Sequence, residues 1–122
     1  MKVYLAAAMV FAGCAAPARA EWMSGEQLAE VCLGAVPVDR AMCLSYVMGV
    51  MDGVRYLDAP PRTPVGTSAG EVRDVVVAYL GEHPEARGMQ GREIVRAAVV
   101  AAWPKIQPKV PAKKAAVRKR RP

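Results

Sequence analysis

The side chains that could do covalent or metal chemistry are three cysteines, at positions 14, 32 and 43, and a single histidine, His83. Two thiols can form a disulfide, act as a redox pair or bind a metal, and a histidine can transfer protons. A reactive thiol pair favours Cys-x-x-Cys spacing in a cationic setting, whereas ten residues separate Cys32 from Cys43. No second histidine or cysteine cluster accompanies His83, so we expect neither a metal site nor a cofactor.

The other residues that could take part in catalysis have simpler interpretations. His83 precedes Pro84 at the end of an expected helix, where a histidine lies near the negative end of the helix dipole. Ser24 and Ser68 have the spacing of helix caps, and Ser45 lies within an apolar helix. No nucleophile motif or phosphate-binding loop is present in the sequence. We therefore predict that the protein is not an enzyme.

Residues 1–20 have the layout of a secretory signal peptide: one early lysine, a short apolar run and the small-x-small ending Ala18-Arg19-Ala20. We expect cleavage after Ala20 and export to the periplasm as an unlipidated chain. The alternative is a lipoprotein, because the FAGC stretch resembles the box in which a cysteine, here Cys14, becomes the lipidated first residue. Phe11 fits poorly where that box prefers leucine.

Export changes the interpretation of the cysteines. Removal of Cys14 with the signal leaves Cys32 and Cys43 as an even pair in an oxidising compartment. We predict a disulfide between them. Closing this loop would contribute about 3 kcal/mol in the chain-entropy model, which matters for so short a domain.

The mature chain divides sharply in charge. Residues 21–103 hold 11 acidic and 7 basic residues, while residues 104–122 hold 8 basic residues, four prolines and no acidic residue. The second segment has no apolar periodicity and is expected to be a disordered basic tail. One folded domain of residues 21–103 remains.

The apolar spacing of that domain is helical almost throughout, with no convincing strand pattern. Ser24 with Gln27, and Ser68 with Glu71, have the spacing of capping boxes for a first and a third helix. Asp39 is expected to cap a second helix, and Pro104 follows the fourth. We predict an all-α fold, a compact bundle of about four helices with one disulfide.

The second helix is apolar from Ala41 to Met51, which is too short to cross a bilayer. Gly49 and Gly53 share one face of it, so a neighbouring backbone can approach closely there. We favour a helix crossing within the chain, and a homodimer contact through this face is the alternative. Asp52 and Arg55, three residues apart, are expected to form a solvated pair of little energetic weight.

Two short motifs follow one another along the predicted helices. The first is Cys43-x-x-Tyr46-x-x-Gly49, preceded by Cys32 in the first helix. The second is Tyr79-Leu80-x-x-His83-Pro84, which follows a proline-rich loop. Together they resemble the Rap1a/Tai family of bacterial immunity proteins; the resemblance covers roughly residues 22–105, and the signal peptide agrees with it.

The resemblance implies a small helical periplasmic protein, commonly dimeric, that binds and blocks a peptidoglycan amidase effector of type VI secretion. This chain would then be an inhibitor, with a cognate cell-wall amidase as its partner. The family often has a second cysteine pair, and Arg62 and Lys105 stand at those places here. The rigidity of the loop and of the C-terminal end is therefore in question.

Three functions are compatible with the sequence. The first is the inhibitor, for which the proline-rich loop is the leading contact surface, with Asp58, Arg62 and Gly66 as candidate binding residues. The second is a periplasmic chaperone or stress factor. The third is binding of an anionic envelope surface through the tail. The tail cations concerned are Lys113, Lys114, Arg118, Lys119, Arg120 and Arg121. The tail lacks aromatic residues for base stacking, so we expect no specific nucleic-acid partner.

Overall fold

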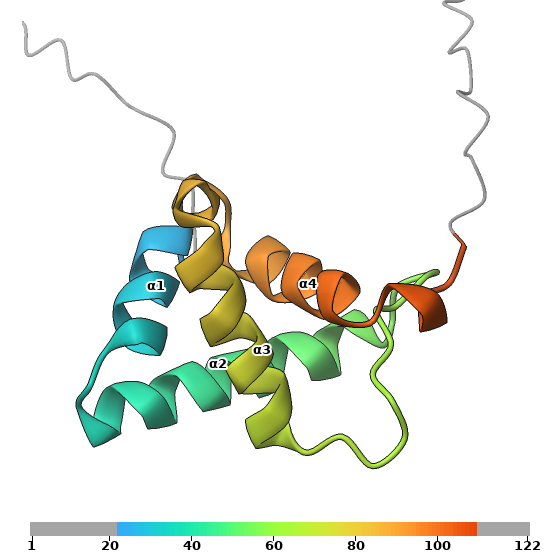
Figure 1. Cartoon of the computed structure of the whole chain (residues 1–122), viewed down its shortest axis with the longest axis horizontal. Coiled ribbons are helices and arrows are strands. Elements are labelled where there is room, and N and C mark those ends of the chain that lie inside the picture. The colour runs from blue at the N-terminus through green and yellow to red at the C-terminus, as the bar shows by residue number, and fades with distance from the viewer. Residues whose placement is uncertain (1–21, 110–122) are drawn as a thin grey trace, which may run out of the picture.

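The structure, a computed structural model, describes residues 22–109. Its α-helices are α1 (Gly25–Leu33), α2 (Pro37–Val54), α3 (Ala69–Glu82) and α4 (Gly91–Ala102) (Figure 1). Two short 3-10 helices, η1 (Pro84–Gly88) and η2 (Pro104–Ile106), follow α3 and α4. Within residues 22–109 no strand forms. The predicted all-α bundle with one disulfide is thus confirmed.

Two of the helix starts follow directly from local sequence. At α1, Ser24 Oγ accepts a hydrogen bond from the Gln27 backbone N–H at 3.2 Å, and Gln27 Oε1 accepts one from the Ser24 N–H at 3.0 Å. At α3, Ser68 and Glu71 make the same reciprocal pair at 3.2 and 2.6 Å. Both predicted capping boxes are confirmed, and each satisfies N–H groups that a helix start leaves without partners.

The predicted cap at Asp39 is wrong. Helix α2 begins at Pro37, with Val36 as its N-cap, and Asp39 lies in the first turn. Proline is suited to the first helical position because its φ angle is already helical and its missing N–H would have no partner there. The Asp39 carboxylate still lies at the positive end of the helix dipole, and its side chain lies against Gly34 at the end of α1.

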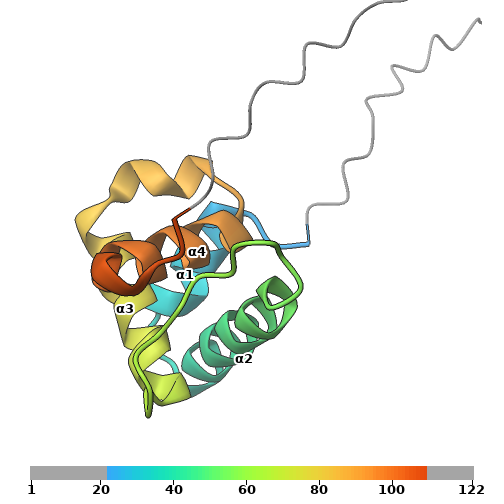
Figure 2. The ribbon, with the colours of Figure 1, turned by 90° about the vertical axis from the view of Figure 1, so that its right-hand side faces the viewer.

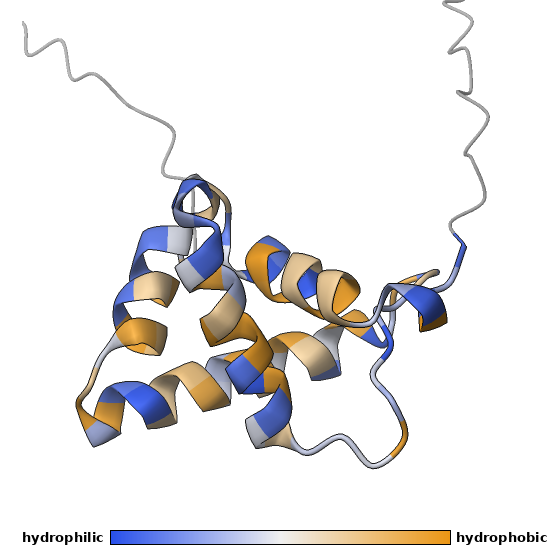
Figure 3. Ribbon diagram, viewed as in Figure 1, coloured by the Kyte–Doolittle hydropathy of each residue, from blue (hydrophilic) through white to orange (hydrophobic). Residues whose placement is uncertain are grey.

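Each of the four α-helices packs against the other three around one hydrophobic core (Figures 1 and 2). The largest fully buried side chains come from all four of them: Leu28, Cys43, Val47, Val76, Leu80, Ile94, Val95 and Val99. Apolar and charged residues follow one another along α4, as expected for a helix with one buried face (Figure 3). Burying these side chains is the main favourable contribution to folding.

The starts of α1 and α4 lie against each other without side chains between them. The Gly25 N–H donates to the Met89 carbonyl at 2.8 Å, and the Gly91 N–H donates to the Met23 carbonyl at 3.0 Å. A Cβ on Gly25 would lie 2.5 Å from the Met89 oxygen, and one on Gly91 would lie 2.8 Å from the Tyr46 hydroxyl. Only glycine allows this approach at the two positions.

The predicted helix crossing at Gly49 and Gly53 is wrong. Both glycines are exposed, and a Cβ built on either would meet nothing within 4 Å. The buried side chains of α2, Cys43, Val47 and Val54, lie on another face of the helix, so neither glycine lies in a helix crossing. The Asp52–Arg55 pair is as predicted, with 3.7 Å between the charged groups and both side chains largely exposed.

Several expectations lie outside the described residues: the signal peptide with its cleavage after Ala20, lipidation at Cys14, and the tail cations from Lys113 to Arg121. The described chain continues past Trp103 into η2 and on to Lys109. In the part that the structure describes, no helix has the length and apolar character needed to traverse a bilayer.

Candidate functional site

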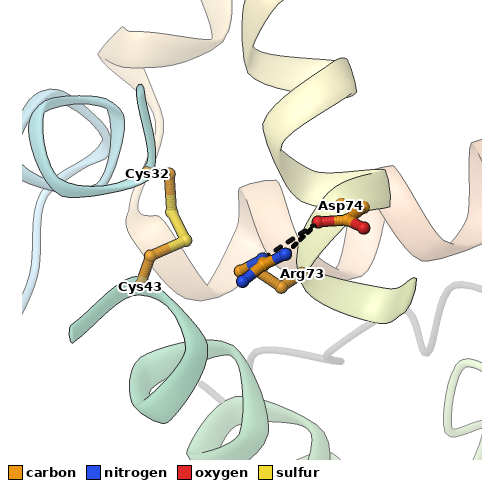
Figure 4. The surroundings of a disulfide bond; sticks show 4 residues. All are labelled: Cys32, Cys43, Arg73 and Asp74. Atoms are coloured by element: carbon orange, nitrogen blue, oxygen red, sulfur yellow. Dashed lines mark hydrogen bonds and ion pairs between the residues drawn. A yellow bond between two sulfur atoms is a disulfide. The ribbon is translucent and has the colours of Figure 1, made fainter. Parts of the chain in front are cut away.

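The Cys32–Cys43 disulfide ties the end of α1 to α2, with 4.9 Å between the two Cα atoms, as predicted. Both cysteines are buried. Arg73 of α3 lies between this disulfide and Asp74, whose carboxylate accepts a hydrogen bond from Arg73 Nε at 2.9 Å (Figure 4). The cysteines are therefore a structural staple, which fits the interpretation that they are no catalytic thiol pair.

Tyr46 and Leu80, from the two family motifs, point into the bundle. The Tyr46 ring is partly buried and its hydroxyl lies over Gly91 at the start of α4. Burial raises the pKa of the Tyr46 phenol, and the nearby Arg92 guanidinium opposes that shift. Leu80 is 1% exposed. These residues fix how the helices pack, whereas Gly49 of the first motif lies on the surface.

His83 closes α3. Its ring centroid lies 4.3 Å from that of Tyr79, and its Nδ1 lies 3.1 Å from Glu85 Oε1 at the start of η1, which begins at Pro84. The Glu85 backbone N–H and then His83 lower the pKa of the Glu85 carboxyl. This arrangement stabilises the turn between α3 and η1. Among the described residues, no group of histidine, cysteine and carboxylate side chains could hold a metal ion.

The loop between α2 and α3, residues 55–68, runs past the C-terminal end of α4 (Figure 2). One side chain holds it there. Gln107 Oε1 accepts a hydrogen bond from the Arg62 backbone N–H, and Gln107 Nε2 donates to the Arg62 carbonyl, both at 2.9 Å. Gln107 Nε2 also donates to the Trp103 carbonyl at 2.9 Å. An amide side chain thus joins the α2–α3 loop to the segment after α4, the two segments in which the resemblance implied a second cysteine pair.

Beyond this contact the loop turns sharply at Gly66. Its φ angle of 86° is in the left-handed region that favours glycine, and Thr67 Oγ1 donates to the Pro64 carbonyl at 2.7 Å. Val65, at the tip, is 106% exposed. Asp58 lies at the other end of the loop and is exposed as well. The three predicted contact residues therefore mark the start, the anchored middle and the tip of one exposed loop.

A family model described as "Rap1a immunity proteins" matches residues 24–104. The match spans all four α-helices and the disulfide. The chain belongs to the Rap1a family of immunity proteins. No curated protein and no solved structure matches it.

Membership of the Rap1a family indicates the general class of function. Immunity proteins bind a cognate effector, and those of this family are inhibitors that act typically in the periplasm. The placement of the motif residues agrees with a role in packing: Tyr46, Tyr79 and Leu80 hold the helices together. Surface residues must then make the contacts with any partner.

Three residues of structural importance were missed in the sequence. Gly25 and Gly91 stand at helix starts, where a glycine is usually interpreted as part of a turn, and nothing local signals the approach of a second backbone. Gln107 lies in the segment expected to be disordered, and its partner Arg62 is 45 residues away. The only signal in the sequence was that Arg62 and Lys105 stand where the resemblance implies a second cysteine pair, which suggested that these two segments lie close together.

Proposed function

We propose that this Rap1a protein is a periplasmic immunity protein that binds a peptidoglycan amidase effector of type VI secretion and occludes its active site. The observation that carries the proposal is the family match over residues 24–104, which covers the whole helical bundle. The amidase comes from the resemblance of the two motifs, and export from the signal peptide expected at residues 1–20.

The α2–α3 loop is the part of the surface best suited to enter a cleft. Val65 at its tip is fully exposed, the Gly66 turn sets the direction of the chain, and Gln107 fixes the backbone of Arg62. A loop that is already ordered loses less conformational entropy on binding than a flexible one. We propose that Asp58, Arg62 and the Gly66 turn contact the amidase around its active site.

We further propose that two copies pair through α2. Its exposed stripe consists of Val38, Met42, Ser45 and Gly49, spaced by three and four residues, with Val38 59% and Met42 48% exposed. The small centre of the stripe allows two helix backbones to approach closely. An antiparallel pair about Gly49 is self-complementary, as a two-fold interface requires. Gly49→Leu should turn a dimer into a monomer in light scattering, and a monomeric wild-type protein would contradict this pairing.

The basic tail is proposed to hold the protein near anionic envelope surfaces. Its eight cations would give an attachment that weakens as salt rises, because ions screen exposed charges. The folded domain would carry the specific binding. Because Gln107 contacts Arg62 and Trp103, the tail should be removed after Lys109, so that the loop anchor is kept.

The test is protection of cells that make a candidate peptidoglycan amidase effector in the periplasm. The full chain and the chain ending at Lys109 should both protect, and Val65→Asp should abolish protection. The control Val36→Asp changes another exposed valine, 53% exposed, at the other end of the bundle and should protect. Protection against an unrelated periplasmic amidase would favour a chaperone or stress factor, and no protection by any folded variant would contradict the proposal.

A further inference from the structure

An open hollow of about 410 Å³ lies where the end of α2 passes α4. Apolar side chains of Val50, Val54 and Leu57 form one part of its lining, together with Gly53, and Arg92 and Arg96 of α4 form the other. No acidic residue lines it. We name this site, with these six residues, the cationic hollow.

Arg92 and Arg96 differ from three other arginines of the domain in their electrostatic partners. Arg55, Arg73 and Arg87 each have a carboxylate within 4 Å. Over residues 22–109, neither Arg92 nor Arg96 forms such an ion pair. They are exposed and stand one helical turn apart, a like-charge spacing that slightly destabilises a helix. A helix with this spacing gains stability when an anion binds between the two cations.

The apolar surface continues beyond the hollow. Arg96 also lines a neighbouring hollow of about 340 Å³, together with Glu93, Ala97 and Val100 of α4, Ala59 and Pro61 of the α2–α3 loop, and Gln107 and Pro108. Leu57 and Val100 are each 44% exposed. Arg96 thus stands between two apolar depressions that border the start of the proposed amidase-contacting loop.

We propose that the cationic hollow binds an acidic segment of the effector, with carboxylates on the two arginines and an adjacent apolar side chain against Val50, Val54 and Leu57. This inference rests on the proposed function and names the chemistry of the partner. Guanidinium groups bind carboxylates with two parallel hydrogen bonds, and an apolar neighbour is required to displace water from the hollow. The charge of the site and the apolar lining together select such a segment over a simple polyanion.

The first test uses a peptide and needs no effector. Acetyl-Leu-Glu-Leu-Glu-amide is titrated into the labelled full chain by NMR, with acetyl-Leu-Gln-Leu-Gln-amide and inorganic phosphate as controls at equal ionic strength. The acidic peptide should shift the amide signals of residues 50–57 and 92–96 and bind at least about tenfold more tightly than either control. Arg92→Gln/Arg96→Gln should remove this preference, while the control Arg40→Gln/Arg87→Gln should keep it.

The second test measures the affinity of the same three proteins for the amidase. The Arg92→Gln/Arg96→Gln chain should bind at least about tenfold more weakly than wild type, and the control should bind as wild type. Unchanged affinity in the hollow variant, with wild type binding well, overturns the inference and leaves the proposed function intact. If wild type binds no amidase, the proposed function is wrong, and the peptide titration alone then tests whether the cationic hollow binds an acidic segment. Equal binding of phosphate and acidic peptide there also overturns it.

Discussion

The two ends of the bundle are held together by different chemistry. At one end the disulfide joins α1 to α2, and at the other Gln107 joins the α2–α3 loop to the segment after α4, through two hydrogen bonds to Arg62 and one to Trp103. A disulfide stabilises mainly by restricting the unfolded chain, whereas exposed hydrogen bonds act locally and are partly replaced by water. The difference indicates a covalently held scaffold at the disulfide end and, at the end where we place amidase contact, a loop whose order depends on the hydrogen bonds of one side chain.

The largest effect should come from the disulfide. Reduction of the wild-type protein should lower the free energy of unfolding by about 3 kcal/mol, the value for closing a short loop. Denaturant titrations with and without dithiothreitol measure this change on the same chain. An unchanged midpoint after verified reduction would show that the covalent staple is not what holds α1 on α2.

The next effect concerns the contact of α1 with α4. Gly25→Ala should destabilise the domain by about 1–3 kcal/mol, because its Cβ would lie 2.5 Å from the Met89 oxygen and the two backbones must separate. Gly81→Ala is the matched control: it is exposed within α3 and its Cβ would meet nothing within 4 Å. That control should stabilise by up to about 1 kcal/mol, since alanine favours helix. Thermal unfolding of both variants tests the pair.

Removal of the loop anchor should have a smaller, local effect. Gln107→Ala should weaken the local structure by about 1–2 kcal/mol, so the Arg62 amide should exchange with solvent roughly tenfold faster. Gln107→Glu keeps the acceptor and loses the donor, so it should protect that amide better than alanine does. Amide exchange at α1 should stay unchanged in both variants. Faster exchange throughout the domain would mean that the two ends are not independent.

The smallest effect is a pH dependence at the start of α3. Hydrogen bonds from the Ser68 backbone and side chain lower the pKa of Glu71. Because the folded pKa lies below the unfolded one, this contribution is complete above the unfolded pKa and is lost as pH falls through the folded pKa. Glu71→Gln should therefore flatten the stability profile in the acidic range. An acid limb identical to that of wild type would contradict this assignment.

Local signals in the sequence predicted local structure well. Ser24 with Gln27 and Ser68 with Glu71 form hydrogen bonds between residues three positions apart, so the local sequence is enough to predict them. The paired cysteines followed from the compartment expected for an exported chain. The capping partners are three residues apart, and each mature cysteine has only one other cysteine to pair with.

The sequence predicted the structure poorly where a residue's role depends on which distant segment packs against it. Two glycines four apart show only that a backbone could approach, and at Gly49 none does. Gly25 and Gly91 meet other backbones, but the contacts join segments far apart in the chain. Arg92 and Arg96 gain their importance from the α2 residues beside them, which no spacing within α4 reveals.

The most direct test of the central claim is a titration of the purified mature protein against the candidate amidase effector acting on peptidoglycan. Hydrolysis should fall linearly and reach zero near one binding site per amidase, with no peptidoglycan cleavage by the Rap1a protein alone. The Cys32–Cys43 disulfide should be intact before the assay, so that the scaffold is folded. Full hydrolysis in the presence of excess folded protein would contradict the immunity function.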